Sequence, residues 1–179
     1  MAWFARDRRQ KVPSHEIAED LFHVMVEEEP RCIAEGVFLV AEEDPDPTQP
    51  GIRLPRTLWP QFRARMRLYR EATVLMVLLS KAHVEPKYEE VLKSYERLIF
   101  PVRPTPDAIA KQEALRAAMQ DISQLVDPQG DRKALSWSAA WLNGMGHAEI
   151  NPINLSLCGL YWMGNYTAVA GALKELRPI

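Results

Sequence analysis

Hydrophobic and polar positions divide residues 57–82 into two contrasting halves. The first half contains four arginines between positions 63 and 70 and no acid before Glu71, whereas residues 74–79 are all apolar. Larger side chains recur through both halves at a spacing typical of packed helices: Phe62, Met66, Tyr69, Thr73 and Met76. This pattern predicts one long helix that begins in solvent and ends in the core, near the centre of the fold.

The same helical periodicity continues on both sides of this stretch. Ser14 is a favourable N-cap, and the residues after it place Ile17 and Leu21 on one side of an amphipathic helix. Further helices are expected to begin near four start signals: Pro86, Thr105-Pro106, Asp131 and Asn151-Pro152. We therefore predict an all-α fold, a single irregular helical bundle of about six or seven helices over residues 14–179, preceded by an N-terminal arm of residues 1–13.

Residues 31–56 are harder to assign. Pro30 is expected to end or kink the first helix. Residues 31–42 then fit a helix with an apolar stripe, although residues 37–40 fit a short strand equally well. No partner strand is evident elsewhere, and we favour the helix. Residues 43–56 contain four prolines and a glycine, which predicts a long loop.

Composition limits the broad class of protein. A chain of 179 residues, 47% hydrophobic and 26% charged, is typical of one globular domain. The formal net charge of −2 argues against general nucleic-acid binding, which needs concentrated positive charge. The two cysteines, Cys32 and Cys158, form no CxxC pair, which favours a reducing compartment. The first residues carry arginines instead of an apolar signal segment, and no stretch of about 18 apolar residues occurs, so we predict a cytoplasmic protein.

Charge is strongly segregated along the chain. Residues 14–47 hold eleven acids and one base, whereas residues 48–70 hold six arginines and no acid. Guanidinium groups hold carboxylate or phosphate oxygens in two-point contacts, so several of these arginines are candidate partner-binding residues. They are Arg56, Arg63, Arg67 and Arg70. The acids of residues 14–47 can equally neutralise them within the fold, which is the interpretation that we favour.

The N-terminal arm combines Trp3 and Phe4 with four basic residues. Such a segment can dock in a groove of a partner protein or lie at a membrane surface. Membrane contact is not favoured, because so short an arm makes a marginal anchor. Trp3 and Phe4 are therefore further candidate partner-binding residues.

The last third of the chain concentrates the large aromatic side chains. Packing in the core is the more frequent role of such residues, but they can also line a ligand pocket. The candidate pocket residues are Trp137, Trp141, His147, Cys158, Trp162 and Asn165. Cys158 lies inside an apolar helix, where burial is expected to raise the pKa of its thiol and make it unreactive. No residue between Ile150 and Leu173 is charged, so the helix of residues 150–174 can also form a homodimer contact.

Motifs for chemistry are weak. His15, Glu19 and His23 recur every four residues on one helix face, but no second metal-binding motif accompanies them, and a solvated polar face is the favoured explanation. The serines have no nucleophile-elbow context, and the chain contains no glycine-rich phosphate loop. We therefore predict no catalytic residue, no metal site and no cofactor.

Two classes of function remain after these exclusions. The segregated charge, the aromatic and basic arm and the uncharged helix near the C-terminus favour a non-catalytic protein-binding module, such as an accessory subunit, adaptor or regulator of a larger assembly. The alternative is a helical protein that binds a small molecule or cofactor in the aromatic C-terminal third, a class that includes enzymes. Binding of nucleic acid is the least favoured partner class.

Overall fold

Six α-helices form the described part of the chain, which confirms the predicted all-α class. A computed structural model describes residues 11–27, 37–41, 51–100, 103, 105–125, 133–146 and 151–179. The helices are α1 (Ser14–Phe22), α3 (Trp59–Val84), α4 (Glu89–Ile99), α5 (Pro106–Leu125), α6 (Lys133–Asn143) and α7 (Pro152–Glu175). Shorter helical turns cover His23–Glu27, a π-helix, and Arg56–Leu58 and Pro86–Tyr88, both 3-10 helices.

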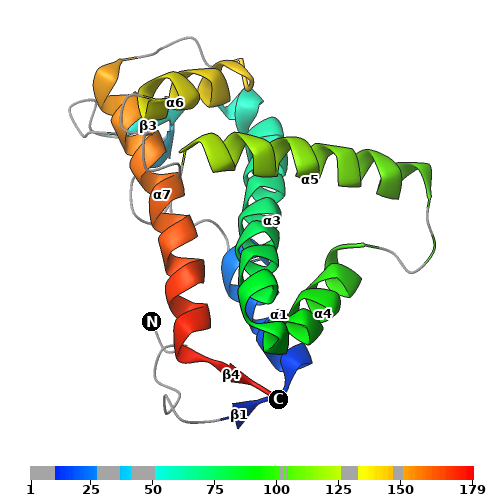
Figure 1. Ribbon diagram of the computed structural model, residues 1–179. Helices are drawn as coiled ribbons and strands as arrows, with labels where there is room; N and C mark the ends of the chain where they lie inside the picture. Colours follow the sequence, from blue (N-terminus) through cyan, green and yellow to red (C-terminus); the bar gives the residue numbers. More distant parts are fainter. Residues whose placement is uncertain are drawn as a thin grey trace.

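Helix α3 is the central element, as the two-part pattern predicts. Its 26 residues span about 39 Å, and the other helices pack against it or against one another around it. Figure 1 shows α5 crossing α3, α7 running down one side, α6 at the beginning of α3 and α1 with α4 near its end. The predicted stripe is buried except at Met76, which is only partly covered.

Two of the predicted helix starts are confirmed by hydrogen bonds from a capping side chain to a backbone amide of the first helical turn. The Asn151 side chain accepts from the amide of Asn154 at 2.8 Å, and the Thr105 hydroxyl accepts from the amide of Ala108 at 3.2 Å. Ser14, by contrast, is not the N-cap of α1. Its hydroxyl donates to the carbonyl of Ile179 at 3.1 Å instead.

The ends of the described chain are joined by a short parallel ladder. Strand β1 (Lys11–Val12) pairs with β4 (Arg177–Pro178), and Val12 is buried. Figure 1 places this ladder beside the C-terminus, below α1 and α7. The last residues of the predicted arm therefore belong to the folded body, whereas Trp3 and Phe4 lie outside the described residues.

The helix expected over residues 31–42 is wrong where the structure describes it. Strand β2 (Phe38–Val40) pairs in parallel with β3 (Ile52–Leu54), inside the stretch expected to be loop. The side chains of Phe38, Ile52 and Leu54 are fully buried, and the Phe38 ring lies 4.8 Å from that of Phe62 on α3. A three-residue partner between Gly51 and Pro55 leaves almost no periodicity to detect, so pairing decided the assignment.

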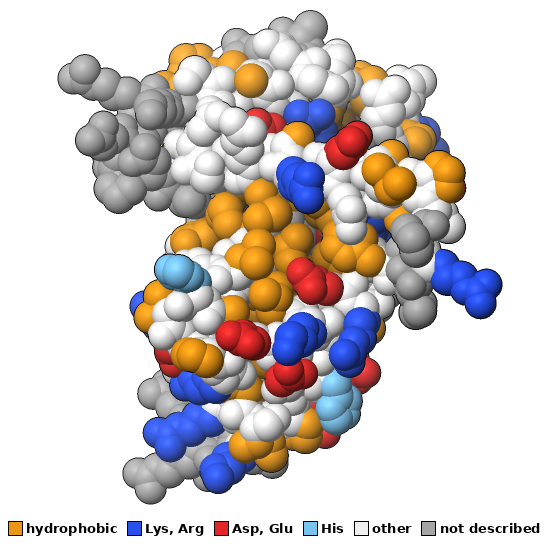
Figure 2. Space-filling view, turned by 45° about the vertical axis from the view of Figure 1, so that its right-hand side comes forward, with side chains coloured by type: hydrophobic (Ala, Val, Ile, Leu, Met, Phe, Trp, Pro, Cys, Tyr) orange, Lys and Arg blue, Asp and Glu red, His pale blue; other side chains and the backbone are white. Residues whose placement is uncertain are grey.

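Apolar surface remains outside the core. Figure 2 shows one face on which hydrophobic side chains gather across the middle, with charged side chains above and below. Exposed large hydrophobic side chains occur on α3, α4 and α5, at Leu79, Leu98 and Ile109. None of the described helices combines the length and apolar character required to cross a bilayer.

Candidate functional site

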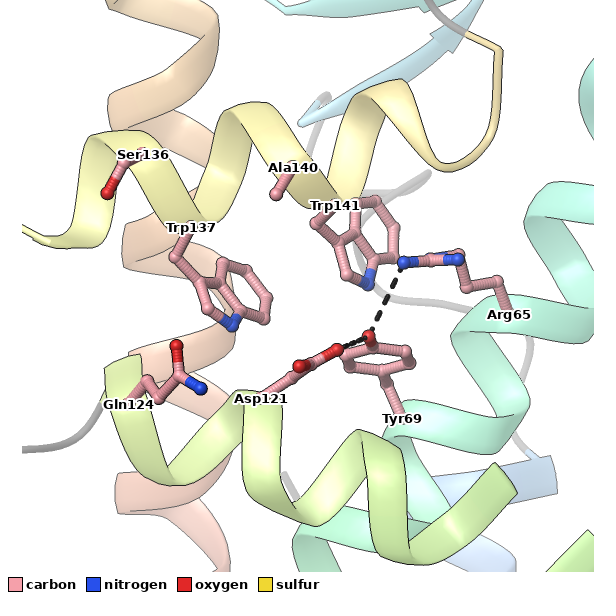
Figure 3. A pocket seen from close by; sticks show the side chains of 8 residues that line it. All are labelled: Arg65, Tyr69, Asp121, Gln124, Ser136, Trp137, Ala140 and Trp141. Carbon is pink, nitrogen blue, oxygen red and sulfur yellow. Dashed lines mark hydrogen bonds between the residues drawn. The ribbon is translucent and has the colours of Figure 1, made fainter. Parts of the chain in front are cut away.

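A pocket of about 320 Å³ lies between α3, α5 and α6 (Figure 3). It is lined by Arg65, Tyr69, Asp121, Gln124, Ser136, Trp137, Ala140 and Trp141. This volume is at the lower end of the range for pockets that bind small molecules. Polar side chains from two helices meet an aromatic wall from the third, an arrangement that can both orient and bury a ligand.

Helical spacing explains how each helix contributes to the pocket. Residues separated by three or four positions lie on the same helix face. Arg65 and Tyr69 are so related on α3, as are Asp121 and Gln124 on α5, and Trp137 and Trp141 on α6. Three pairs of side chains, each about one turn apart, therefore converge on the same space.

A chain of two hydrogen bonds joins the charged groups of the pocket. The Tyr69 hydroxyl donates to Oδ2 of Asp121 at 2.5 Å and accepts from Nη2 of Arg65 at 3.4 Å. Burial, followed by the hydrogen bond to Asp121, raises the pKa of Tyr69 well above its usual value. The phenol consequently stays protonated at neutral pH and acts as a fixed donor to the carboxylate.

Arg65 is held in place by aromatic rings. Its guanidinium carbon lies 5.2 Å from the ring centre of Tyr69 and 5.6 Å from that of Trp141. A Cβ atom at Gly144 would lie only 3.0 Å from the guanidinium nitrogens, so glycine leaves the room that Arg65 occupies. Among the described residues, no carboxylate forms an ion pair with Arg65.

Two buried nitrogens at the pocket have no hydrogen-bond partner in the described part of the chain. They are Nε of Arg65 and the indole Nε1 of Trp141. Trp141 is 2% exposed. In Figure 3 its nitrogen points toward the side of the pocket on which Tyr69 and Asp121 lie. Because leaving a buried donor unpaired is unfavourable, an acceptor that reached these two groups would be held by them.

The aromatic wall of the pocket belongs to a larger cluster of rings. Trp137 and Trp141 are nearly parallel, with ring centres 6.4 Å apart, and the Tyr69 ring meets both edge-on at 6.2 and 5.9 Å. Behind them, Trp162 of α7 lies 5.5 Å from Trp141. Close packing on this side makes the wall rigid and leaves the free space toward Arg65, Asp121 and Gln124.

The predicted pocket residues are only partly brought together. Trp137 and Trp141 line the pocket, whereas Trp162 is buried behind them and Asn165 faces a different cavity. Cys158 is fully buried, and burial raises the pKa of its thiol to about 12, as expected for an unreactive core cysteine. His147 lies outside the described residues.

Arg65, Tyr69 and Asp121 are pocket residues that the sequence interpretation missed. The i, i+4 spacing of an arginine and a tyrosine in the central helix was a detectable signal. No sequence signal indicated Asp121, because its place in the pocket depends on how α5 crosses α3.

The predicted arginine cluster is divided between the surface and the interior. Arg67 pairs with Glu71 on its own helix, at 3.1 Å, and Arg70 is buried and donates to the Tyr161 hydroxyl. Arg56 and Arg63 are exposed. The counter-charge observed for Arg67 therefore comes from α3 itself and not from residues 14–47.

A second cavity of about 340 Å³ lies between the π-helix His23–Glu27 and α7. Arg70, Tyr161 and Asn165 are its polar lining residues, and most of the others are apolar. The amide nitrogen of Asn165 donates to the Tyr161 carbonyl at 2.9 Å. In this cavity, as in the first pocket, polar lining residues bond to one another.

The described residues contain no group of three histidine, cysteine or carboxylate side chains close enough to hold a metal ion. Comparisons of the chain with protein-family models, with curated proteins and with solved structures give no match. The geometry and chemistry of the pocket are therefore the basis on which a function can be proposed.

Proposed function

We propose that the protein binds a small organic molecule in the pocket between α3, α5 and α6. The observation that carries this proposal is a pair of donor groups at the aromatic wall, the Arg65 Nε–H and the Trp141 indole N–H, which have no acceptor among the described residues. A ligand that supplies the acceptor would remove the unfavourable state of the buried N–H. The aromatic wall would cover its apolar part.

A binding role is favoured over catalysis by the chemistry of the lining residues. The eight described side chains that line the pocket include no histidine, cysteine or lysine. Tyr69, whose pKa is raised, is occupied as a donor to Asp121 and is a poor base. Ser136 lies at the rim on α6 and has no neighbouring imidazole among the lining residues to activate it.

The proposal is tested by filling the pocket from its exposed wall. Ala140→Phe places an aromatic side chain in the free space, and Ala117→Phe, at an exposed position of α5 that does not line the pocket, is the matched control. Saturation-transfer NMR with a library of small polar and aromatic compounds should detect ligands of the wild type and of Ala117→Phe. The same ligands should be lost from Ala140→Phe.

Two outcomes would contradict this proposal. The first is a library that yields no ligand for the wild-type protein. The second is a set of ligands that bind Ala140→Phe as tightly as the wild type, which would place their site elsewhere. Circular dichroism melting of both variants verifies that they are folded.

A protein-binding role is the second candidate function, and it is favoured by the exposed face of α7. Ile153 and Leu160 are 64% and 65% exposed on the same side of this helix, and no residue between positions 151 and 173 is charged. Such a face favours an apolar contact, and in the simplest case the partner is a second copy of the chain packed about a two-fold axis.

Sedimentation equilibrium over a range of protein concentrations tests this second candidate. Leu160→Glu should shift a concentration-dependent dimer toward monomer, because it places a charge at the centre of the contact. Ile109→Glu, at a 53% exposed position of α5, is the control and should leave the association unchanged. A wild-type protein that remains monomeric at every concentration would rule out the homodimer.

A further inference from the structure

The pocket carries two opposite charges at fixed positions, and this decides which ligands suit it. Arg65 and Asp121 form no direct ion pair, yet both contact the Tyr69 hydroxyl, at 3.4 and 2.5 Å. The bonded nitrogen of Arg65 and the bonded oxygen of Asp121 therefore cannot be farther apart than the sum of these two distances. The charges of the described lining residues cancel, but the site has a positive end on α3 and a negative end on α5 (Figure 3).

We propose that the ligand is a free α-amino acid with an apolar or aromatic side chain, bound as its zwitterion. This inference rests on the proposed function and specifies its ligand class. The carboxylate accepts from the Arg65 guanidinium and the Trp141 indole N–H, and the ammonium group donates to Asp121. The side chain lies along Trp137 and Ala140.

Charge complementarity favours a zwitterion over ligands with a single charge. A simple carboxylic acid would pair with Arg65 but place its negative charge near that of Asp121. A simple amine would pair with Asp121 but place its positive charge near that of Arg65. Because charges interact strongly at short range in a partly buried site, each mismatch weakens binding. In an α-amino acid both charges are attached to one carbon atom, which matches two protein charges linked through a single hydroxyl group.

Size and wall chemistry further limit the ligand. A volume of about 320 Å³ corresponds to roughly ten water molecules, so it suits a compound of about a dozen non-hydrogen atoms. Trp137 and Trp141 supply an apolar surface next to the charged groups, and Gln124 and Ser136 lie at the other end of the pocket from Arg65 (Figure 3). L-Phenylalanine has the required size, charges and apolar body, and it is the probe of choice.

The first test compares three compounds on the wild-type protein by isothermal titration calorimetry. L-Phenylalanine carries both charges, 3-phenylpropanoate lacks the ammonium group and 2-phenylethylamine lacks the carboxylate. We expect L-phenylalanine to bind at least about tenfold more tightly than either analogue, because each analogue leaves one protein charge without a partner. No variant is required for this comparison, so a folding defect cannot obscure it.

The second test assigns each ligand charge to its protein partner. Asp121→Asn keeps an acceptor for Tyr69. It should weaken the binding of L-phenylalanine about tenfold or more, and it should leave the binding of 3-phenylpropanoate unchanged or make it tighter. Arg65→Met keeps an aliphatic stem. It should weaken the binding of L-phenylalanine and 3-phenylpropanoate but not that of 2-phenylethylamine. The controls Asp107→Asn and Arg116→Met alter exposed residues of α5 outside the pocket and should bind all three compounds like the wild type.

Binding of the analogues as tightly as L-phenylalanine, or unchanged L-phenylalanine binding by Asp121→Asn, would overturn the inference. The inference also fails, while the proposed function stands, if none of the three probes binds but library ligands still depend on Ala140. If neither the probes nor any library compound binds, both are wrong.

Discussion

Replacing Glu71 by alanine is expected to lower the free energy of unfolding by about 3 kcal/mol. The Glu71 side chain is 2% exposed and bridges two cations, Nε of Arg67 at 3.1 Å and Nζ of Lys111 at 2.8 Å. Lys111 also donates to the carbonyl of Ile99 at 2.9 Å, so the carboxylate connects α3, α5 and the end of α4. Its removal leaves both cations without their carboxylate and opens a cavity. Because the two cations are partly solvated, the loss should lie near the lower limit for buried pairs. Urea unfolding followed by far-UV circular dichroism measures it.

Glu90→Ala is the matched control for this prediction. Glu90 forms an ion pair with Lys93 at 2.7 Å, but the two side chains are 63% and 52% exposed. Exposed pairs contribute little because water screens them, so the urea midpoint should remain close to that of the wild type. Equal midpoint shifts for the two variants would show that burial of Glu71 does not govern its contribution.

Trp141→Ala is expected to destabilise the protein by about 4 kcal/mol. The indole lies between rings of several elements, with centre-to-centre distances of 5.9 Å to Tyr69, 6.0 Å to Phe38 and 6.4 Å to Phe62. Truncation would leave a large cavity where β2, α3, α6 and α7 meet. Differential scanning calorimetry, analysed with urea unfolding at 25 °C, gives the difference in free energy.

The milder variant Trp141→Phe separates the packing of the ring from its N–H group. Phenylalanine keeps an aromatic ring and removes a buried donor that has no partner in the described structure, so the loss should be below about 1.5 kcal/mol. If the ligand proposal is right, Trp141→Phe should still weaken the binding of L-phenylalanine, because one donor to the ligand carboxylate is absent. A Trp141→Ala protein as stable as Trp141→Phe would refute the packing argument.

Most helices could be predicted because their signals are local. The starts at Thr105 and Asn151 are set by side chains that reach amides only three residues away. Ser14 has the same chemistry but bonds to Ile179, far along the chain, so its local preference was overridden by a contact that no window of sequence contains.

The strand pair shows the same limit. Residues 37–40 are apolar enough for either helix or strand, and their conformation depends on a partner of three residues from the proline-rich stretch. For Arg67 and Arg70 the sequence favoured neutralisation by the acids of residues 14–47 and left a partner as the alternative. In the structure Arg67 stays exposed and pairs with the buried Glu71, whereas Arg70 is buried and donates to the Tyr161 hydroxyl.

For the pocket, the amino-acid order alone established that Arg65 and Tyr69 share one face of the central helix and that Trp137 and Trp141 share one face of another. It established these relations because a helix repeats every 3.6 residues. Only the tertiary structure determined that these two faces meet and that Asp121 of α5 stands between them. The angle and offset at which helices cross depend on how many side chains pack together at once, and no local sequence pattern specifies all of these contacts.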